Sequence, residues 1–131
     1  MKKYLPLFLR ITVAVILIQT LRFKFTAHPD SVYIFNALSL EPFGRILTGI
    51  LELIAGILLI FRKTAWLGAF LALGVIGGAI LSHVFILGIE INNDKGLLFF
   101  TAVFTFIISF LILYLYRKDI LLLKKTTKLL R

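Results

Sequence analysis

The stretch Glu41–Phe61, EPFGRILTGILELIAGILLIF, decides the fold because this apolar run is too continuous for the helix of a soluble protein. Glu52 stands close to its centre. A charged side chain at that depth of a membrane costs roughly 2.5–3.5 kcal/mol on insertion scales, so a cation, a proton or water in a cavity must compensate Glu52. Gly49 and Gly56 flank it by one helical turn on each side and leave room for a ligand or for close helix contact.

The composition of the whole chain indicates an integral membrane protein. Of its 131 residues, 60% are hydrophobic and 16% are charged, and the mean hydropathy is +1.04. A soluble domain of this size carries more charge. The length suits one domain whose burial is supplied largely by lipid. The chain contains no Cys, which excludes disulfides, thiolate chemistry and Cys-ligated metals within it.

Four hydrophobic runs predict an all-α membrane protein with a bundle of four transmembrane helices. We expect the spans at about residues 4–25, 43–61, 65–89 and 97–116. The first run follows two Lys residues but lacks a cleavage pattern of small residues, so we interpret it as a retained span and not as a signal peptide. Together the spans form a membrane domain over residues 1–118.

Two shorter segments complete the expected architecture. In the loop between the first two spans, Asp30 predicts the N-cap of a short interfacial helix. The apolar stripe of this helix consists of Val32, Phe35 and Leu38. Residues 119–131 predict a basic amphipathic tail that rests on an anionic membrane surface.

The distribution of charge along the chain predicts the topology. The formal net charge is +9. Most Lys and Arg residues lie at the N-terminus, in the Arg62-Lys63 turn and in the tail, where the one acid is Asp119, whereas opposite charges nearly cancel in the other two loops. The positive-inside rule therefore places both termini in the cytoplasm. Because topology accounts for the basic charge, we do not expect the protein to bind nucleic acid.

Arg10 and Glu52 are the ionisable residues expected within the hydrocarbon, one of each sign. We interpret Arg10 as the counter-ion of Glu52, in preference to Arg45, which can extend outward to the interface. In the alternative interpretation, Arg10 itself extends to the nearer membrane interface.

Further polar residues gather at the outer ends of the spans. The candidate ligand-binding or intramembrane polar site comprises Arg10, Lys24, Glu41, Arg45, Glu52, His83 and Asp94. His83 lies about 9 Å inside the outer end of its span. It either donates to a carbonyl or hydroxyl oxygen, or serves as a proton relay or ligand contact that faces an outward cavity.

Small residues and hydroxyl groups recur at helical spacing in the third and fourth spans. Gly74, Gly78 and Ser82 form a ridge that we expect to pack against a neighbouring helix of the bundle, or alternatively against a second copy in a homodimer. A second stripe consists of Thr101, Thr105 and Ser109. Hydroxyl groups at this spacing either bond back to carbonyls of their own helix or line a polar interior.

The sequence lacks the motifs of several enzyme classes. It contains no Walker loop, no glycine-rich dinucleotide turn, no zinc-ligand spacing and no serine nucleophile motif. His28 and His83 fall near the outer side, so a bis-histidine haem is geometrically conceivable, but no other feature supports it. We therefore expect no metal site and no enzyme activity of the chain on its own.

Taken together, these residues resemble the DoxX family of small four-helix bacterial membrane proteins. The matching positions are Arg10, Lys24-Phe25-Thr26, Pro29-Asp30-Ser31, Phe35, Glu41-Pro42, Gly44-Arg45, Gly49, Glu52, Gly78-Ala79, Ser82-His83, Gly88-Ile89-Glu90, Asp94 and Gly96. The resemblance covers about residues 10–100 and leaves the basic tail outside. Lys95 departs from it, because a second glycine of an Asp-Gly-Gly turn is expected there.

The resemblance implies a multi-pass protein of the bacterial cytoplasmic (inner) membrane, in contact with the lipid bilayer and with other membrane or periplasmic subunits. Some DoxX relatives are linked to membrane oxidoreductase assemblies, including the quinone-reducing subunit of a thiosulfate-oxidising enzyme. Distant four-helix relatives reduce quinones through cysteine pairs, and that chemistry cannot be carried over to a chain without Cys. The cofactor that the resemblance suggests is a quinone, reached through a partner subunit or by direct contact.

Three functional hypotheses fit these residues. The leading one is an accessory subunit or a module that binds a small molecule, lipid or quinone in an outward polar pocket around Lys24, Arg45, Glu52 and His83. The second is a quinone-interacting component of a membrane oxidoreductase, in which His83 or Glu52 takes the proton. The third is a structural scaffold subunit, in which an Arg10–Glu52 pair only fixes the helix register.

Overall fold

Four long helices dominate the part of the chain that the computed structural model describes, residues 4–91 and 94–118. They are α1 (Leu5–Phe25), α3 (Phe43–Ile60), α4 (Ala65–Ser82) with its π-helical extension η2 (His83–Leu87), and α5 (Leu97–Leu115). Two short elements, α2 (Pro29–Ala37) and the 3₁₀ turn η1 (Arg62–Thr64), lie between them. By length and composition, four helical stretches can cross a membrane, with η1, α4 and η2 forming one of them. The predicted all-α membrane bundle is confirmed, whereas the predicted tail 119–131 lies outside the described residues.

The short helix α2 begins two residues earlier than expected, at Pro29. The cap is His28, whose Nδ1 accepts a hydrogen bond from the backbone N–H of Asp30 at 3.2 Å. The predicted N-cap at Asp30 is therefore wrong, because Pro29 has a fixed φ that suits the first helical position and takes that place. Phe35 is buried as part of the expected apolar stripe, and Tyr33 is exposed.

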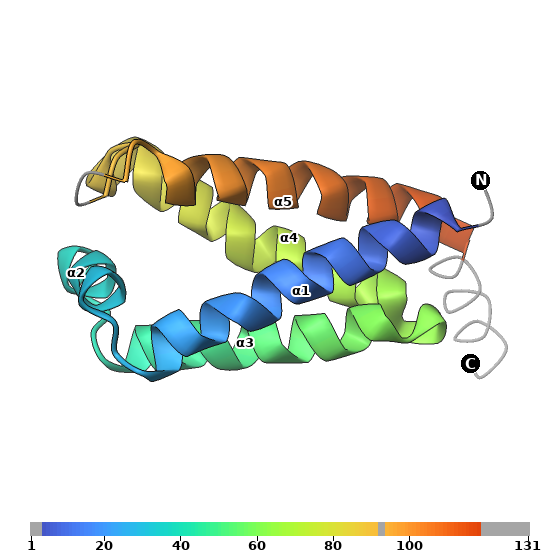
Figure 1. Cartoon of the computed structure of the whole chain (residues 1–131), viewed down its shortest axis with the longest axis horizontal. Helices are drawn as coiled ribbons and strands as arrows, with labels where there is room; N and C mark the ends of the chain where they lie inside the picture. The colour runs from blue at the N-terminus through green and yellow to red at the C-terminus, as the bar shows by residue number, and fades with distance from the viewer. Residues whose placement is uncertain (1–3, 92–93, 119–131) are drawn as a thin grey trace, which may run out of the picture.

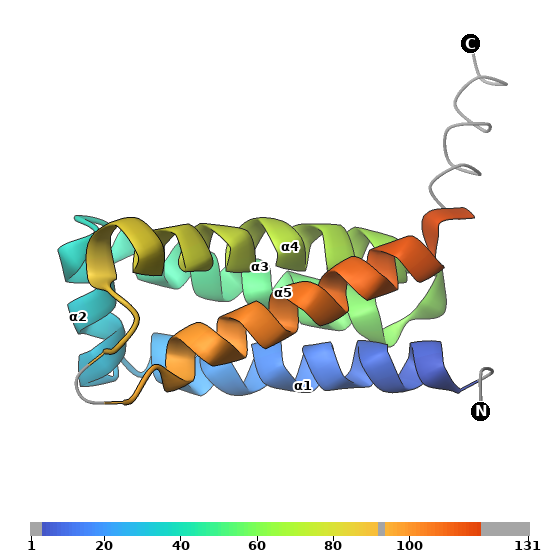
Figure 2. The ribbon, with the colours of Figure 1, turned by 90° about the horizontal axis from the view of Figure 1, so that it is seen from above.

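The long helices form two pairs that diverge like the arms of a V. The most extensive contacts join α1 to α3 and α4 to α5. Figure 1 shows the two pairs close together at the end where the described chain begins and ends, which we call the closed end, and apart at the other end. There α2 lies across the opening and contacts α1, α3 and η2 (Figure 2), and we call this the α2 end.

The packed core lies towards the closed end. Its buried members include Leu9, Val13 and Leu17 of α1, Ala55 and Leu59 of α3, Ala65, Ala69 and Ala72 of α4, and Ile112 and Tyr116 near the end of α5. The small side chains of α4 let it approach α3 closely. At Gly68, a Cβ atom would come within 2.9 Å of the Ala55 carbonyl oxygen. The core is thus concentrated at one end, which leaves the other end free to hold a cavity.

Candidate functional site

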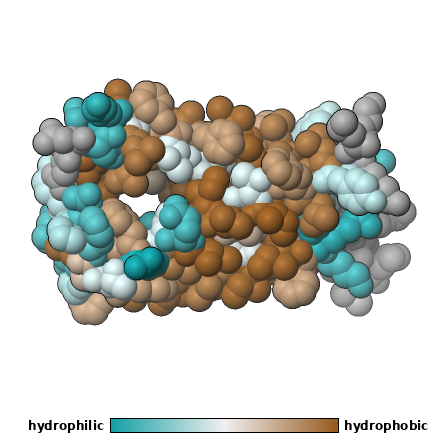
Figure 3. All heavy atoms as spheres, viewed as in Figure 1, coloured by the Kyte–Doolittle hydropathy of each residue, from teal (hydrophilic) through white to brown (hydrophobic). Residues whose placement is uncertain are grey.

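A cavity of about 880 Å³ lies between the two helix pairs where they diverge. Residues of α1 and α3 form one wall, residues of α4, η2 and α5 form the other, and α2 contributes to the end. The space-filling view shows a hollow near the α2 end, with teal hydrophilic residues beside the brown hydrophobic surface (Figure 3). The volume falls within the range of about 300–1,000 Å³ that is usual for small-molecule pockets.

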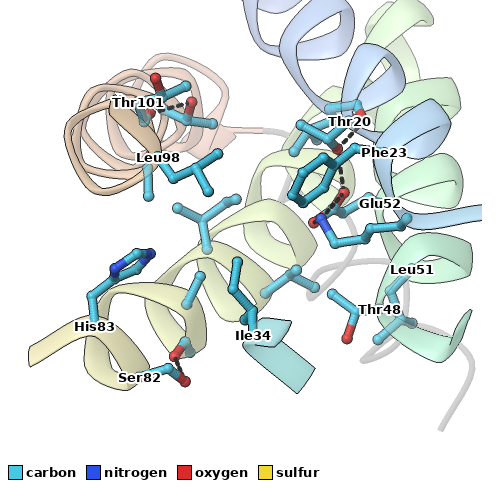
Figure 4. Close-up of a pocket in the computed structure, with 18 of the residues that line it drawn as sticks. Thr20, Phe23, Ile34, Thr48, Leu51, Glu52, Ser82, His83, Leu98 and Thr101 are labelled. Atoms are coloured by element: carbon cyan, nitrogen blue, oxygen red, sulfur yellow. Dashed lines mark hydrogen bonds and ion pairs between the residues drawn. The ribbon is translucent and has the colours of Figure 1, made fainter. Parts of the chain in front are cut away.

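Apolar side chains line most of this cavity, and a smaller number of polar groups converge on it. The polar lining residues are Gln19, Thr20, Lys24, Thr48, Glu52, Ser82, His83, Thr101 and Thr105. Figure 4 shows Thr20 and Glu52 on one side of the space and His83 and Leu98 on the other, with Ile34 of α2 at the lower centre of the view. This arrangement suits a ligand with a hydrophobic body and polar atoms.

The buried carboxylate of Glu52 is held by two residues of α1. Lys24 Nζ lies 2.8 Å from Glu52 Oε1 and 3.0 Å from Oε2, and the Thr20 hydroxyl donates to Oε2 at 2.6 Å. The side chain of Glu52 is 4% exposed and that of Lys24 is 13% exposed. Charge-assisted hydrogen bonds are stronger than neutral ones, and here they offset the cost of burying the carboxylate. The prediction that Glu52 faces the bundle and has a counter-charge is confirmed.

Close packing of α1 on α3 makes this ion pair possible. Gly49 and Gly56, one turn on either side of Glu52, receive side chains of α1. A Cβ atom on Gly49 would come within 2.6 Å of the Phe25 ring, and one on Gly56 within 2.9 Å of Ile18 Cγ1. Because both glycines lack a side chain, α1 lies near enough for its polar residues to reach the carboxylate.

The predicted ion pair between Arg10 and Glu52 is wrong. Arg10 lies about ten residues before Thr20 on α1, a distance of roughly 15 Å along the helix, which is beyond the reach of its side chain. It is buried at the closed end, where its Nη1 lies 3.5 Å from the Ile60 carbonyl oxygen and its guanidinium lies 5.7 Å from the centre of the Tyr116 ring. Both partners are at C-terminal helix ends, which attract a cation.

Arg45 and Glu41 form a second ion pair beside the cavity. Arg45 Nε lies 2.8 Å and 3.0 Å from the two carboxylate oxygens of Glu41. The guanidinium also donates to the backbone carbonyl of Lys24. Neither residue lines the cavity, so this part of the predicted site instead fastens the end of α1 to the start of α3.

His83 begins the π-helical segment and is buried. Its Nδ1 lies 2.9 Å from the carbonyl oxygen of Gly88. Because a carbonyl only accepts, Nδ1 carries a proton in this contact. The edge of the ring contacts Phe99, with the ring centroids 5.6 Å apart. The predicted donation to a carbonyl is confirmed, and the same ring lines the cavity.

Asp94 does not line the cavity but organises the turn before α5. Its carboxylate accepts backbone hydrogen bonds from Ile91, Gly96 and Leu98 at 2.8–3.2 Å. Burial raises the pKa of Asp94, but these three donors and nearby His83 together lower it more, so the pKa lies below its usual value. The ionised carboxylate therefore stabilises the fold above its ordinary pKa, and this contribution is lost as the pH falls through the lowered value.

The ridge of Gly74, Gly78 and Ser82 faces the cavity. A Cβ atom added to Gly74 or Gly78 would meet nothing within 4 Å. The expected packing of this ridge against a neighbouring helix is therefore wrong, because the helix pairs have diverged at this level. Ser82 instead donates to the carbonyl of Gly78 at 2.8 Å. The homodimer through the same ridge stays a prediction.

Two residues of the predicted hydroxyl stripe of α5 combine the two arrangements that the spacing suggests, whereas the buried hydroxyl of Ser109 neither lines the cavity nor has a hydrogen-bond partner among the described residues. Thr101 and Thr105 each donate to the carbonyl one turn earlier, at 2.7 and 2.8 Å. Both also line the cavity. They therefore add weakly polar surface to the wall that carries His83.

Sequence reasoning did not assign Thr20 and Gln19 to the site. Thr20 precedes Lys24 by four residues, so both lie on one face of α1, and this spacing was a usable signal. Gln19 is an exposed amide in an apolar span and lines the cavity. Lys24 was expected near the outer face, but its long side chain reaches back to Glu52.

Comparison with known proteins gave one family match. A model of the DoxX family matches residues 5–87. This region extends from α1 to the end of η2, so it includes Lys24, Glu52 and His83. The match does not include residues 88–100, over which we expected the resemblance to continue. A search of curated proteins and a search of solved structures found no match.

Proposed function

The chain belongs to the DoxX family, and from this premise we propose that it is a membrane-embedded module that binds a small hydrophobic molecule with a polar headgroup. The cavity between the helix pairs is the observation that carries this proposal. It is largely apolar, yet the Lys24–Glu52 pair and His83 lie on opposite walls. Hydrophobic walls hold the body of such a ligand, and a few fixed polar groups orient its headgroup.

The setting of this module is proposed from the charge pattern and the family. We expect a multi-pass protein of the bacterial cytoplasmic membrane with the α2 end facing outward. We also expect it to act as an accessory subunit together with other membrane or periplasmic proteins. The scaffold alternative was built on an Arg10–Glu52 pair, and Arg10 instead contacts the end of α3.

The test is native mass spectrometry of the protein purified from its own membranes in a mild neutral detergent. We expect one equivalent of a co-purified small molecule on the wild-type chain. Gly78→Leu places a larger side chain into the cavity, because a Cβ at this position meets nothing within 4 Å. That variant should lose the bound molecule by at least ten-fold and keep its thermal stability.

The matched control adds bulk to the outside of the same helix. Leu81 is 58% exposed and does not line the cavity, so Leu81→Phe should retain the bound molecule. If Gly78→Leu and Leu81→Phe carry the same molecule in the same amount, the cavity is not the binding site and the proposal fails.

Contact with a quinol is a second candidate function, and His83 is the observation that favours it. With its Nδ1 proton directed to Gly88, the neutral ring has at Nε2 the acceptor that a quinol hydroxyl needs. Titration with a soluble quinol analogue should then give saturable binding that His83→Gln weakens. Absence of saturation with the wild-type protein would remove this candidate.

A further inference from the structure

The carboxylate that lines the cavity is paired with an ammonium group. Among the residues that line the cavity, the ionisable ones are Lys24, Glu52 and His83. Lys24 and Glu52 neutralise each other at 2.8 Å. His83 lies on the opposite wall, where its Nδ1 lies 2.9 Å from the carbonyl oxygen of Gly88. On the wall formed by α1 and α3, a molecule that enters the cavity therefore meets an internally compensated ion pair and no free cation.

An anionic headgroup would have to compete for Lys24. Its transfer to a phosphate would leave the carboxylate of Glu52, which is 4% exposed, without its counter-ion. An unpaired buried charge is strongly unfavourable. Arg45 offers no substitute, because it pairs with Glu41 away from the cavity lining. The site should consequently reject phosphates and carboxylates.

Among the ionisable residues of the lining, Lys24 and His83 each offer a group to a ligand, from opposite walls. An ammonium group has three N–H donors, and the two Glu52 oxygens accept two from Lys24. One donor is left for a ligand oxygen. On the other wall, Nδ1 of His83 is taken up by the Gly88 carbonyl, and Nε2 of the neutral ring can accept from a hydroxyl group. A ligand with a carbonyl and a hydroxyl group satisfies both.

The surroundings of the cavity indicate that such a ligand comes from the lipid. The hollow opens on a face that is largely hydrophobic (Figure 3). Phe70 and Leu97 both line the cavity and are more than 60% exposed, so the apolar lining continues onto the membrane-facing surface. A molecule with an acyl chain can therefore enter the cavity laterally from the bilayer while its chain stays in an apolar environment.

On these grounds, and resting on the proposed binding function, we propose that the ligand is an uncharged lipid with hydroxyl and ester oxygens in its headgroup, and that the Lys24–Glu52 pair excludes anionic lipids. A monoacylglycerol has this chemistry. Its phosphorylated counterpart has the same acyl chain and glycerol, and carries a phosphate monoester with its negative charge in place of one hydroxyl group.

The experiment compares 1-oleoylglycerol with 1-oleoylglycerol 3-phosphate, titrated into the purified chain in a neutral detergent and measured by native mass spectrometry. The wild-type protein should bind the uncharged lipid at least ten-fold more tightly. Glu52→Gln leaves Lys24 as an uncompensated cation and should reverse this preference in favour of the phosphate. The double variant Lys24→Gln, Glu52→Gln restores neutrality and should restore the preference for the uncharged lipid.

Glu41→Gln is the control, because it breaks an ion pair with Arg45 that does not line the cavity. It should keep the wild-type preference.

Equal binding of the two lipids by the wild-type chain would overturn the inference while leaving the binding function intact. An unchanged preference in a folded Glu52→Gln variant would have the same consequence. If Glu52→Gln does not fold, Lys24→Gln provides the test, because it leaves the carboxylate unpaired and should weaken binding of the phosphate further. An unaltered preference in Lys24→Gln would contradict the inference. Binding of neither lipid would count against both proposals.

Discussion

Lys95 adopts a backbone conformation that suits glycine better than lysine. Its φ is 58°, in the left-handed region, and it immediately precedes Gly96, whose φ is 83°. For residues with a Cβ atom, the left-handed conformation costs roughly 1–2 kcal/mol. The side chain of Lys95 is exposed. The DoxX resemblance leads us to expect glycine at this position, and the geometry of the turn gives the physical reason.

Lys95→Gly should therefore stabilise the protein. Relief of the strain outweighs the greater freedom of glycine in the unfolded chain, and we expect a net gain of about 0.5–1 kcal/mol. Thermal unfolding in detergent should show a midpoint raised by a few degrees. Lys95→Ala is the control: it removes the same charge but keeps the Cβ atom. If alanine raises the midpoint as much as glycine, the gain comes from the charge and not from the backbone.

For the charged residues, the sequence predicts which one needs a partner but not which residue that partner is. The burial of Glu52 and its need for a cation follow from one carboxylate within an apolar run. The identity of the cation depends on how far α1 is shifted along α3, and two glycines of α3 decide this by receiving Phe25 and Ile18. Arg10 was a poor candidate because the end of α3 provides a carbonyl oxygen for its guanidinium and the end of α5 provides the Tyr116 ring.

At the scale of elements, two glycines of α4 play opposite roles ten residues apart. A Cβ on Gly68 would come within 2.9 Å of the Ala55 carbonyl oxygen and the Leu59 backbone nitrogen. Those atoms belong to the backbone of α3 and cannot move aside alone. A Cβ on Gly78 would meet nothing within 4 Å. Gly68 thus permits the close packing of α4 on α3, and Gly78 lines the cavity where the helix pairs diverge.

Gly68→Ala should cost about 1–3 kcal/mol, because it forces α3 and α4 apart at the core. Gly78→Ala should be neutral or stabilising by up to about 1 kcal/mol, because alanine is the better helix former. Thermal unfolding of both variants in the same detergent tests the contrast. Equal destabilisation by the two substitutions would mean that α4 is packed along its whole length and that the helix pairs do not diverge.

The spacing of small residues indicated a helix face but not what that face contacts. Gly74 and Gly78 are spaced as in a close helix crossing, yet they border empty space. The crossing occurs instead at Gly68, which the sequence pattern did not single out. The number of helices and their approximate bounds follow from the hydrophobic runs. The angle between the helix pairs depends on contacts between residues of different helices, such as Gly68 with Ala55, which the pattern within one run does not predict.

On the scale of the whole molecule, the charge distribution distinguishes the two ends of the bundle. Near the closed end, Arg62, Lys63, Arg117 and Lys118 are exposed. The acids of the described residues, apart from buried Glu52, lie in the loops and the short helix at the α2 end. Cytoplasmic loops are enriched in Lys and Arg, so the closed end should face the cytoplasm and the cavity should lie in the outer half of the membrane.

Single cysteines can test this topology directly, because the chain has no Cys of its own. Tyr33 on α2 and Lys63 at the closed end are both exposed. A membrane-impermeant maleimide added to spheroplasts should label Tyr33→Cys at once and Lys63→Cys only after the membrane is permeabilised. Ser39→Cys, beyond the end of α2, provides a second outer position and should behave like Tyr33→Cys. If only Lys63→Cys is labelled in sealed spheroplasts, the closed end faces outward and the predicted topology is wrong. Lipid would then reach the cavity from the cytoplasmic leaflet.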